Sequence, residues 1–153
     1  MKENILQESV SLTPIGRVIN GVEYPSDVKW KNIVSEVVIA PQLAEALDGI
    51  EDFSHIVIVF YLHKVNENRR SLLKVHPGGR EELPLVGVFA TRSPVRPNPI
   101  GITEVKLLER RGNILKVLGL DAYDGTPVLD IKPYLRRGDL VEEVTTPDWL
   151  LRL

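Results

Sequence analysis

The sequence of 153 residues contains no cysteine. This absence excludes a disulfide framework, a cysteine nucleophile and a zinc site built on thiolates. Long apolar runs are absent too, because no stretch approaches the roughly 18 residues of a membrane-spanning helix. The first ten residues mix acidic and polar side chains with apolar ones, unlike a signal peptide. We therefore expect a single domain over residues 1–153, in the cytoplasm.

Histidine is scarce, and its three positions are His55, His63 and His76. Their spacing matches no helical or finger-like metal motif. If His55 and His63 lie on one strand, they are about 26 Å apart at ~3.3 Å per residue. No metal site is therefore predicted. His55 fits a satisfied core histidine, whereas His63 lies where an apolar strand meets a basic segment and is expected to contact a ligand.

The net charge of −2 hides a strong segregation of charge. Residues 62–80 carry five basic side chains against a single acid, and residues 91–102 carry two arginines and no acid. The rest of the chain is correspondingly acidic. A basic stretch of this kind can concentrate the field on an anionic partner such as nucleic acid. The alternative is that both stretches are solvated loops.

The apolar pattern favours strands over helices. Strands are predicted at 14–20, 33–40, 55–63, 85–92 and 127–135, and a hairpin between 103 and 120 turns at 110–113. A short helix is expected from Pro41 to Gly49. Both faces of 55–63 are apolar, which indicates a central strand or one that a partner covers. The spacing predicts a mainly β, antiparallel barrel or sandwich, and the missing G-x-G-x-x-G argues against a Rossmann domain.

The most unusual segment is the proline-arginine block at 91–101, TRSPVRPNPIG. It holds three of the chain's eleven prolines within six residues. Each proline fixes its own φ and restricts the residue before it, so the loop is stiff. Arg92 and Arg96 would then be held on a rigid frame, ready for a carboxylate or phosphate. The alternative is a rigid crossover whose arginines lie in solvent.

A second motif is the Asp124-Gly125-Thr126-Pro127 turn, which leads into the last predicted strand. Amides of tight glycine-containing turns can bind a small ligand. Asp130 and Lys132 share one face of that strand by its period of two. The alternative is an ordinary turn followed by an ion pair.

Three segments together resemble the TsaA-like domain family of tRNA methyltransferases. They are 52–64, with DFSH and YLHK at its ends, the block GVFATRSPVRPNPIG at 87–101, and DGTPVLDIKPY at 124–134. The resemblance covers about 12–140, in a short form without the extra C-terminal region of longer bacterial members. It implies a small antiparallel β-barrel with one or two short helices. The C-terminal tail at 141–153 would dock on the barrel or on the partner subunit of a homodimer.

The resemblance also implies S-adenosylmethionine as cofactor and N6 of threonylcarbamoyl-adenosine, next to the anticodon of tRNA, as acceptor. Where bacterial members have a Pro-Arg-Gln run, this chain reads Ser26 to Lys31. The implied cofactor-binding residues are His63, Lys64, Arg92, Ile102, Asp124, Gly125, Thr126, Pro127 and Val128.

The reaction itself suggests further residues. The acceptor nitrogen is a weak nucleophile and needs its proton removed, so Asp130 and Tyr134 are the catalytic candidates. Arg92, Arg96 and Lys132 are the cations available for the threonyl carboxylate. The basic stretch 64–80 would hold the phosphates of the tRNA anticodon stem-loop, and Trp30, Tyr61 and Tyr123 could stack on bases. The substrate-binding candidates are Arg69, Arg70, Lys74, Arg96, Asn98 and Lys132. The alternative function is a dimeric barrel that binds adenosylmethionine or RNA without catalysis.

Overall fold

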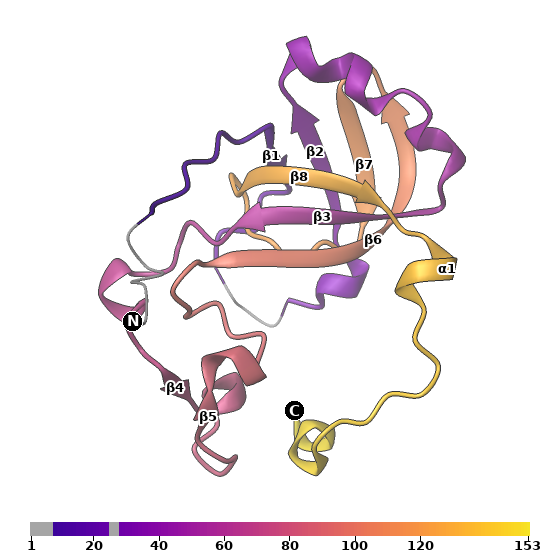
Figure 1. Ribbon diagram of the computed structural model, residues 1–153. Helices are drawn as coiled ribbons and strands as arrows, with labels where there is room; N and C mark the ends of the chain where they lie inside the picture. The colour runs from indigo at the N-terminus through magenta and orange to yellow at the C-terminus, as the bar shows by residue number, and fades with distance from the viewer. Residues whose placement is uncertain (1–7, 25–27) are drawn as a thin grey trace.

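The computed structural model describes residues 8–24 and 28–153 and contains a closed, antiparallel six-stranded barrel (Figure 1). The strands follow one another around the barrel in the order β1-β2-β7-β6-β3-β8. Their bounds are β1 Gly16–Ile19, β2 Val34–Ile39, β3 His55–Tyr61, β6 Ile100–Arg111, β7 Ile114–Leu118 and β8 Pro127–Pro133. The predicted small β-barrel is confirmed.

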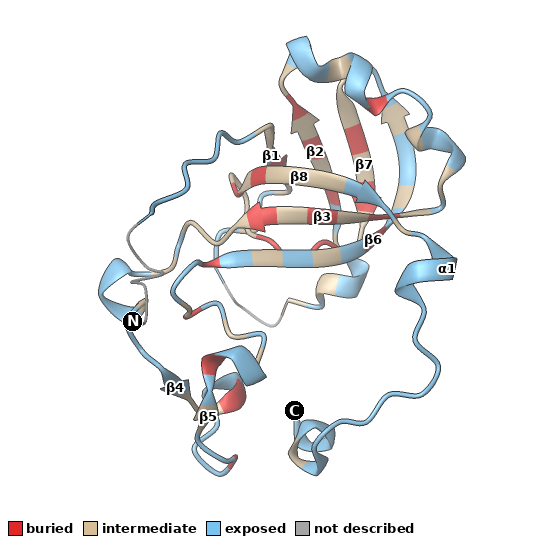
Figure 2. Ribbon diagram, viewed as in Figure 1, coloured by how far each residue is buried: buried red, intermediate tan, exposed pale blue. Residues whose placement is uncertain are grey.

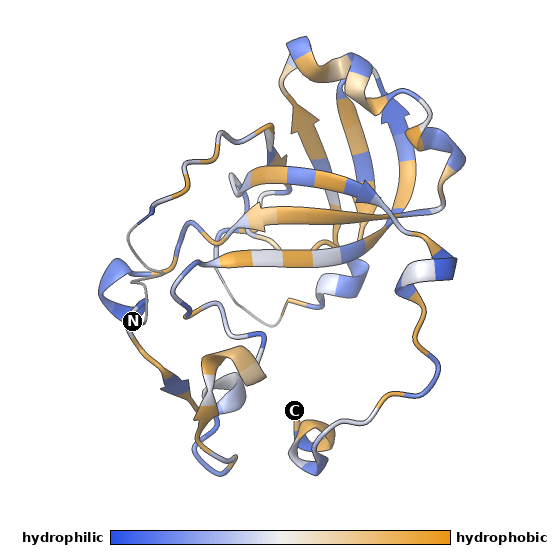
Figure 3. Cartoon of the chain, viewed as in Figure 1, coloured by the Kyte–Doolittle hydropathy of each residue, from blue (hydrophilic) through white to orange (hydrophobic). Residues whose placement is uncertain are grey.

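The barrel interior is filled by alternate side chains of its strands. Ile56, Ile58 and Phe60 of β3 are at most 2% exposed, while the residues between them are half-buried (Figure 2). β3 lies between β6 and β8. Its central position confirms the prediction from its two apolar faces, and Figure 3 shows the strand as apolar along most of its length. The apolar outer face of β3 is thus partly covered within the chain itself.

A short helical segment follows β2, where it was predicted, but its geometry is 3₁₀. It runs over Pro41–Leu47 and is followed by Gly49 at φ 86° and a second turn at Ile50–Asp52. Other 3₁₀ turns are Trp30–Asn32, Glu67–Arg69, Pro77–Gly79, Val88–Ala90 and Asp148–Arg152, and the α-helix found in the described ranges is α1, Arg136–Asp139. None of these helices is long and apolar enough to cross a membrane.

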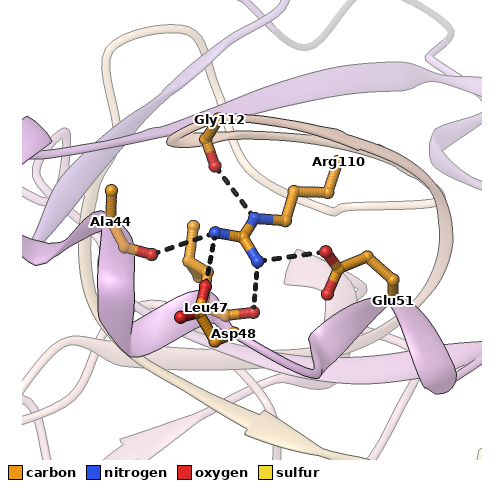
Figure 4. Close-up of polar contacts among 6 residues, drawn as sticks. All are labelled: Ala44, Leu47, Asp48, Glu51, Arg110 and Gly112. Carbon is orange, nitrogen blue, oxygen red and sulfur yellow. Dashed lines mark hydrogen bonds and ion pairs between the residues drawn. The ribbon is translucent and has the colours of Figure 1, made fainter.

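Arg110, near the end of β6, ties the 3₁₀ segment to the barrel (Figure 4). Its guanidinium donates to the carbonyl oxygens of Ala44 and Leu47 at 3.1 and 3.0 Å. It also pairs with the carboxylates of Asp48 and Glu51 at 3.0 and 3.1 Å. These bonds satisfy carbonyls that a short helix leaves without partners. The predicted turn residue is thus a clamp that fixes this end of the barrel.

The strand predicted at 85–92 is wrong for most of its length. Within it, strand pairing is limited to β5, Val86–Gly87, which pairs with the equally short β4, Lys74–Val75, outside the barrel (Figure 1). A 3₁₀ turn follows at Val88–Ala90. Six other strands already close the barrel, so this apolar stretch has no barrel edge to join. The Val88 side chain is instead buried in a small outer lobe at residues 73–90, which contains β4 and β5.

The C-terminal tail lies against this outer lobe. Arg80 donates a hydrogen bond to the carbonyl oxygen of Arg152. Leu153 packs against Gly78, where an added Cβ would lie 3.0 Å from its Cδ2 atom. The tail therefore contacts the basic 62–80 segment within the same chain.

Candidate functional site

One end of the barrel carries a pocket of about 830 Å³, within the range of small-molecule sites. Antiparallel pairing brings the end of β3 beside the start of β6, with Tyr61 opposite Ile100. The start of β8 lies at the same end, since Phe60 pairs with Val128. The loops attached to these strand ends therefore meet around the pocket. Its lining comprises Trp30, Phe60, Leu62, His63, Lys64, Val65, Thr91, Arg92, Ser93, Pro94, Arg96, Asn98, Ile100, Gly101, Ile102, Thr103, Glu104, Asp121, Ala122, Tyr123 and Thr126.

The proline-arginine block forms one wall and is braced by its own side chains. The Thr91 hydroxyl donates to the Val88 carbonyl at 2.8 Å and accepts from the Ser93 amide at 3.1 Å. Arg96 donates to the carbonyls of Thr91 and Ser93 at 3.2 and 3.0 Å. One terminal nitrogen of Arg96 is therefore used to hold the loop in place. Arg92 lines the pocket and is exposed, and the described residues give its side chain no hydrogen bond or ion pair.

His63 also lines the pocket and is held by the Asp-Gly-Thr-Pro turn. Its Nδ1 atom is 3.4 Å from the hydroxyl of buried Thr126. That hydroxyl donates its proton to the Tyr123 carbonyl at 2.7 Å. Nδ1 must therefore be the donor toward Thr126, which leaves Nε2 as an unprotonated acceptor. Burial, and then the charge of Lys64, lower the pKa of His63, so the imidazole is neutral at pH 7.

An aromatic group covers the side of the pocket next to His63. The Lys64 ammonium lies 5.0 Å from the ring centroids of both Tyr24 and Tyr123, a cation–π arrangement. It also donates to the Glu23 carbonyl. Trp30 meets Tyr123 edge to face, with centroids 5.5 Å apart. Trp30 and Tyr123, both stacking candidates, thus lie together. Of the divergent 26–31 segment, 26 and 27 fall outside the described residues.

The Asp124–Val128 run contributes to the pocket through Thr126. The Asp124 carboxylate accepts from the amides of Asn20 and Gly21 at 2.7 and 2.9 Å, and these bonds lower its pKa. Gly125 takes φ 76° and donates its amide to the Val18 carbonyl. Val128 is fully buried in the core. Most of this run therefore shapes the barrel end and holds Thr126 against His63.

Two acidic residues in the pocket were not predicted as site residues. Asp121 is exposed as a residue, yet partial desolvation by the surrounding walls raises the pKa of its carboxyl group. Glu104 lies two residues beyond Ile102 on β6 and shares its face. That periodicity could have identified Glu104 once Ile102 was expected in the site. Asp121 carries no comparable signal beyond its place just before the turn.

The catalytic candidates lie apart from the pocket, which corrects the expectation based on their position after the turn. The Asp130 carboxylate pairs with the Lys132 ammonium at 2.8 Å, and neither residue is part of the lining. The Tyr134 amide donates to the His55 carbonyl, at the far end of β3. Seven residues of strand, about 20 Å at ~3.3 Å each, separate that end from the pocket.

The basic 62–80 segment spreads its predicted substrate-binding residues over an outer surface. Arg69 and Lys74 are exposed. Arg70 turns inward and donates to the Tyr61 hydroxyl. Asn98, in the proline-arginine block, is exposed and lines the pocket.

Comparisons with known proteins agree with this architecture. Residues 20–140 match the tRNA-methyltransferase O N-terminal domain family. A probable S-adenosyl-L-methionine-binding protein of Pyrococcus abyssi is 42% identical over 145 residues, which cover 92% of this chain and 76% of that protein. A tRNA (adenine(37)-N6)-methyltransferase of Homo sapiens is 45% identical over 102 residues, 67% of this chain and 23% of that protein.

A solved structure has the same fold. TrmO from Pseudomonas aeruginosa superposes with a TM-score of 0.71 at 30% identity, over 90% of this chain and 62% of that chain. This chain thus spans less than two thirds of the solved protein and less than a quarter of the human one. The family match extends over most of the described barrel, as the proline-arginine block and the Asp-Gly-Thr-Pro turn indicated. The chain therefore belongs to the tRNA-methyltransferase O N-terminal domain family.

Proposed function

We propose that this protein is an S-adenosylmethionine-dependent methyltransferase acting on N6 of adenine 37 in tRNA. The observation that carries the proposal is the pocket at the barrel end, which the rigid proline-arginine block and His63 both line. The names of the Pyrococcus abyssi and human relatives support the donor and the acceptor respectively.

The pocket residues fit adenosylmethionine, which supplies a methyl group on a positively charged sulfur. Arg92 offers a free guanidinium for its carboxylate. Asp121 and Glu104 provide negative charge for its ammonium and sulfonium groups. The faces and edges of Trp30 and Tyr123 suit a purine ring. Ion pairing, aromatic contact and a volume of about 830 Å³ thus meet the main features of the donor.

His63 is the proton acceptor that the geometry favours. Methylation forms an N–C bond on the acceptor nitrogen while the sulfur keeps the electrons of the bond that breaks. The nitrogen's proton must then leave. The neutral imidazole of His63 accepts it at Nε2, because Nδ1 is directed to Thr126. The resulting imidazolium can release the proton to solvent. The hydrogen bonds of Thr91 and Arg96 hold the proline-arginine block rigid. Little conformational entropy is therefore lost in this loop when the ligands bind.

The acceptor proposed in more detail is threonylcarbamoyl-adenosine in the anticodon stem-loop. The exposed cations of the basic segment, Arg69, Lys74 and Arg80, would hold backbone phosphates. We also propose a homodimer. Large apolar side chains are exposed beside the pocket and on the outer lobe, at Ile102, Leu73, Leu85 and Phe89, and a second copy would cover them.

The test is to incubate the protein with adenosylmethionine and tRNA carrying threonylcarbamoyl-adenosine, and to weigh the digested nucleosides. A mass gain of one methyl on the modified adenosine is expected. A protein that binds adenosylmethionine but adds no methyl to this or unmodified tRNA would be a binding barrel, and the enzyme proposal would fail.

A further inference from the structure

A second, smaller pocket of about 390 Å³ lies next to the first. Asn98 and Ile100 line both pockets, so they form a shared wall at the start of β6. The two pockets also take opposite faces of the end of β3, since Phe60 lines the first and Tyr61 the second. Besides these residues, the second pocket is lined by Arg70 and by aliphatic and proline side chains that include Leu12, Pro99 and Leu129.

Arg70 is the charged group of this pocket, and it is incompletely paired. Its side chain is 26% exposed. One terminal nitrogen donates to the Tyr61 hydroxyl, and the guanidinium carbon lies 5.6 Å from the Tyr61 ring centroid. The Glu67 carboxylate is 3.9 Å away and 86% exposed, a weak interaction. The Nε atom is buried without a hydrogen-bond partner among the described residues.

A buried donor without a partner costs free energy, so a site of this kind favours a ligand that brings an acceptor. The acceptor that best matches a planar guanidinium is a carboxylate. The rest of the lining is mostly proline and aliphatic, with Pro99 and Leu129 as examples. It would cover the apolar part of a small acid. The ligand chemistry is therefore a carboxylate carried on a short, partly apolar group.

The three cations that suit a substrate carboxylate by sequence, Arg92, Arg96 and Lys132, are paired or lie outside the second pocket. Arg96 donates to carbonyls of its own loop. Lys132 pairs with Asp130 and lines neither pocket. Arg92 lines the first pocket, where the donor is proposed to bind. Arg70 is thus the cation best placed to recognise an acidic group that reaches past Asn98 and Ile100.

We infer that this second pocket reads the carboxylate of an amino-acid substituent on the acceptor adenine, with Arg70 as its anchor. The inference rests on the proposed function and names the part of the substrate that selects it. The acceptor nitrogen faces the first pocket while its substituent crosses the shared wall into the second. Unmodified adenine lacks the anion that Arg70 binds and is a poor substrate.

The test uses Arg70→Met and Arg70→Lys in the full chain. The substrates are one tRNA with threonylcarbamoyl-adenosine and the same tRNA without the modification. Arg70→Met should lower kcat/KM on the modified tRNA by about tenfold to a hundredfold, the effect of losing bonds to a charged group. Arg70→Lys keeps the charge without the fork and should lose less. Adenosylmethionine affinity, measured by calorimetry, should be unchanged in both variants and reports that they are folded.

Arg69→Met is the matched control, because Arg69 is the exposed neighbour and lines neither pocket. It should lower kcat/KM by the same factor on both tRNAs, because a lost phosphate contact affects both equally. Binding of the free nucleosides distinguishes recognition of the carboxylate from recognition of phosphate, since a nucleoside carries no phosphate. The wild-type protein should bind threonylcarbamoyl-adenosine more tightly than adenosine, and Arg70→Met should abolish the difference.

The inference is overturned if Arg70→Met lowers kcat/KM equally on both tRNAs or leaves kcat/KM on the modified tRNA unchanged. It is also overturned if the wild type does not bind the modified nucleoside more tightly than adenosine. Methylation of both tRNAs without preference would remove the second pocket's role and leave the methyltransferase function intact. Nucleoside selectivity that depends on Arg70, without methyl transfer to any tRNA, would do the reverse.

Discussion

At the scale of single residues, the environment of His63 determines how the pocket handles protons. The Thr126 hydroxyl is committed to a backbone carbonyl, so His63 directs its Nδ1 proton there and leaves Nε2 open. Burial and Lys64 lower its pKa below the ordinary 6.5. A proton acceptor works only when unprotonated. Activity is therefore expected to fall as pH decreases through that lowered pKa, and to show no loss from this group above pH 7.

His63→Gln should lower kcat by about a hundredfold or more, the usual contribution of a general base, and should remove the acidic limb of the pH–rate profile. His55→Gln is the control, because His55 lies at the far end of β3. It should keep both the rate and the limb. If the acidic limb persists unchanged in His63→Gln, another group accepts the proton.

Some of the residues expected in the site line the pocket, and others lie away from it. The strand end at His63 and the stiffness of the proline-arginine block were readable, because apolar runs and prolines are local signals. Asp124 was expected to hold the cofactor, but its carboxylate is taken up by amides of a loop more than a hundred residues away. Tyr134 follows the Asp-Gly-Thr-Pro turn in the sequence, but it lies beside His55, at the barrel end away from the pocket. Such long-range partners leave no local pattern.

At the scale of elements, the junction of β3 and β6 depends on a glycine. A Cβ on Gly101 would lie 2.5 Å from the Phe60 ring, which fills the core and lines the pocket. Gly101→Ala should therefore destabilise the protein by about 1–3 kcal/mol through overpacking, as measured by urea unfolding, and should weaken adenosylmethionine binding. Gly87→Ala is the control, since a Cβ there would lie 3.9 Å from the Leu73 carbonyl oxygen, an ordinary contact. Equal stability of the two variants would contradict the packing described for this junction.

The strands that were predicted well are runs rich in β-branched and other apolar residues, as in 33–40 and 55–63. The predicted strand at 85–92 has the same composition yet pairs only at Val86–Gly87. Strand propensity reports that a segment suits a pleated, half-buried surface. Whether a barrel edge is available depends on the other strands, so the sequence of the segment could not reveal its true partner.

At the scale of the whole molecule, the exposed apolar residues predict association. Phe89 is 79% exposed and Leu73 is 75% exposed on the outer lobe, and Ile102 at the pocket is 56% exposed. The outer face of β3, which first suggested a dimer, is partly covered by its own chain. We expect light scattering at micromolar concentration to give twice the mass of the chain. Phe89→Ser should shift the protein toward monomer, and a wild-type monomer would contradict the proposed dimer.

Segregated charge is the other property of the whole molecule, and it links the barrel to its proposed substrate. The near-neutral total concealed the basic 62–80 segment and a pocket that contains Asp121 and Glu104. The basic segment suits a polyanion, and the acids suit the positive groups of the donor. Composition alone could not separate these two surfaces, because their separation depends on how the chain folds.

Methyl transfer to tRNA tests the central claim most directly. The protein is incubated with adenosylmethionine labelled in its methyl group and with tRNA carrying threonylcarbamoyl-adenosine, and the digested nucleosides are analysed by mass spectrometry. We expect one labelled methyl on the modified adenosine, with transfer strongly reduced in His63→Gln. Intact donor binding without any labelled nucleoside would contradict it.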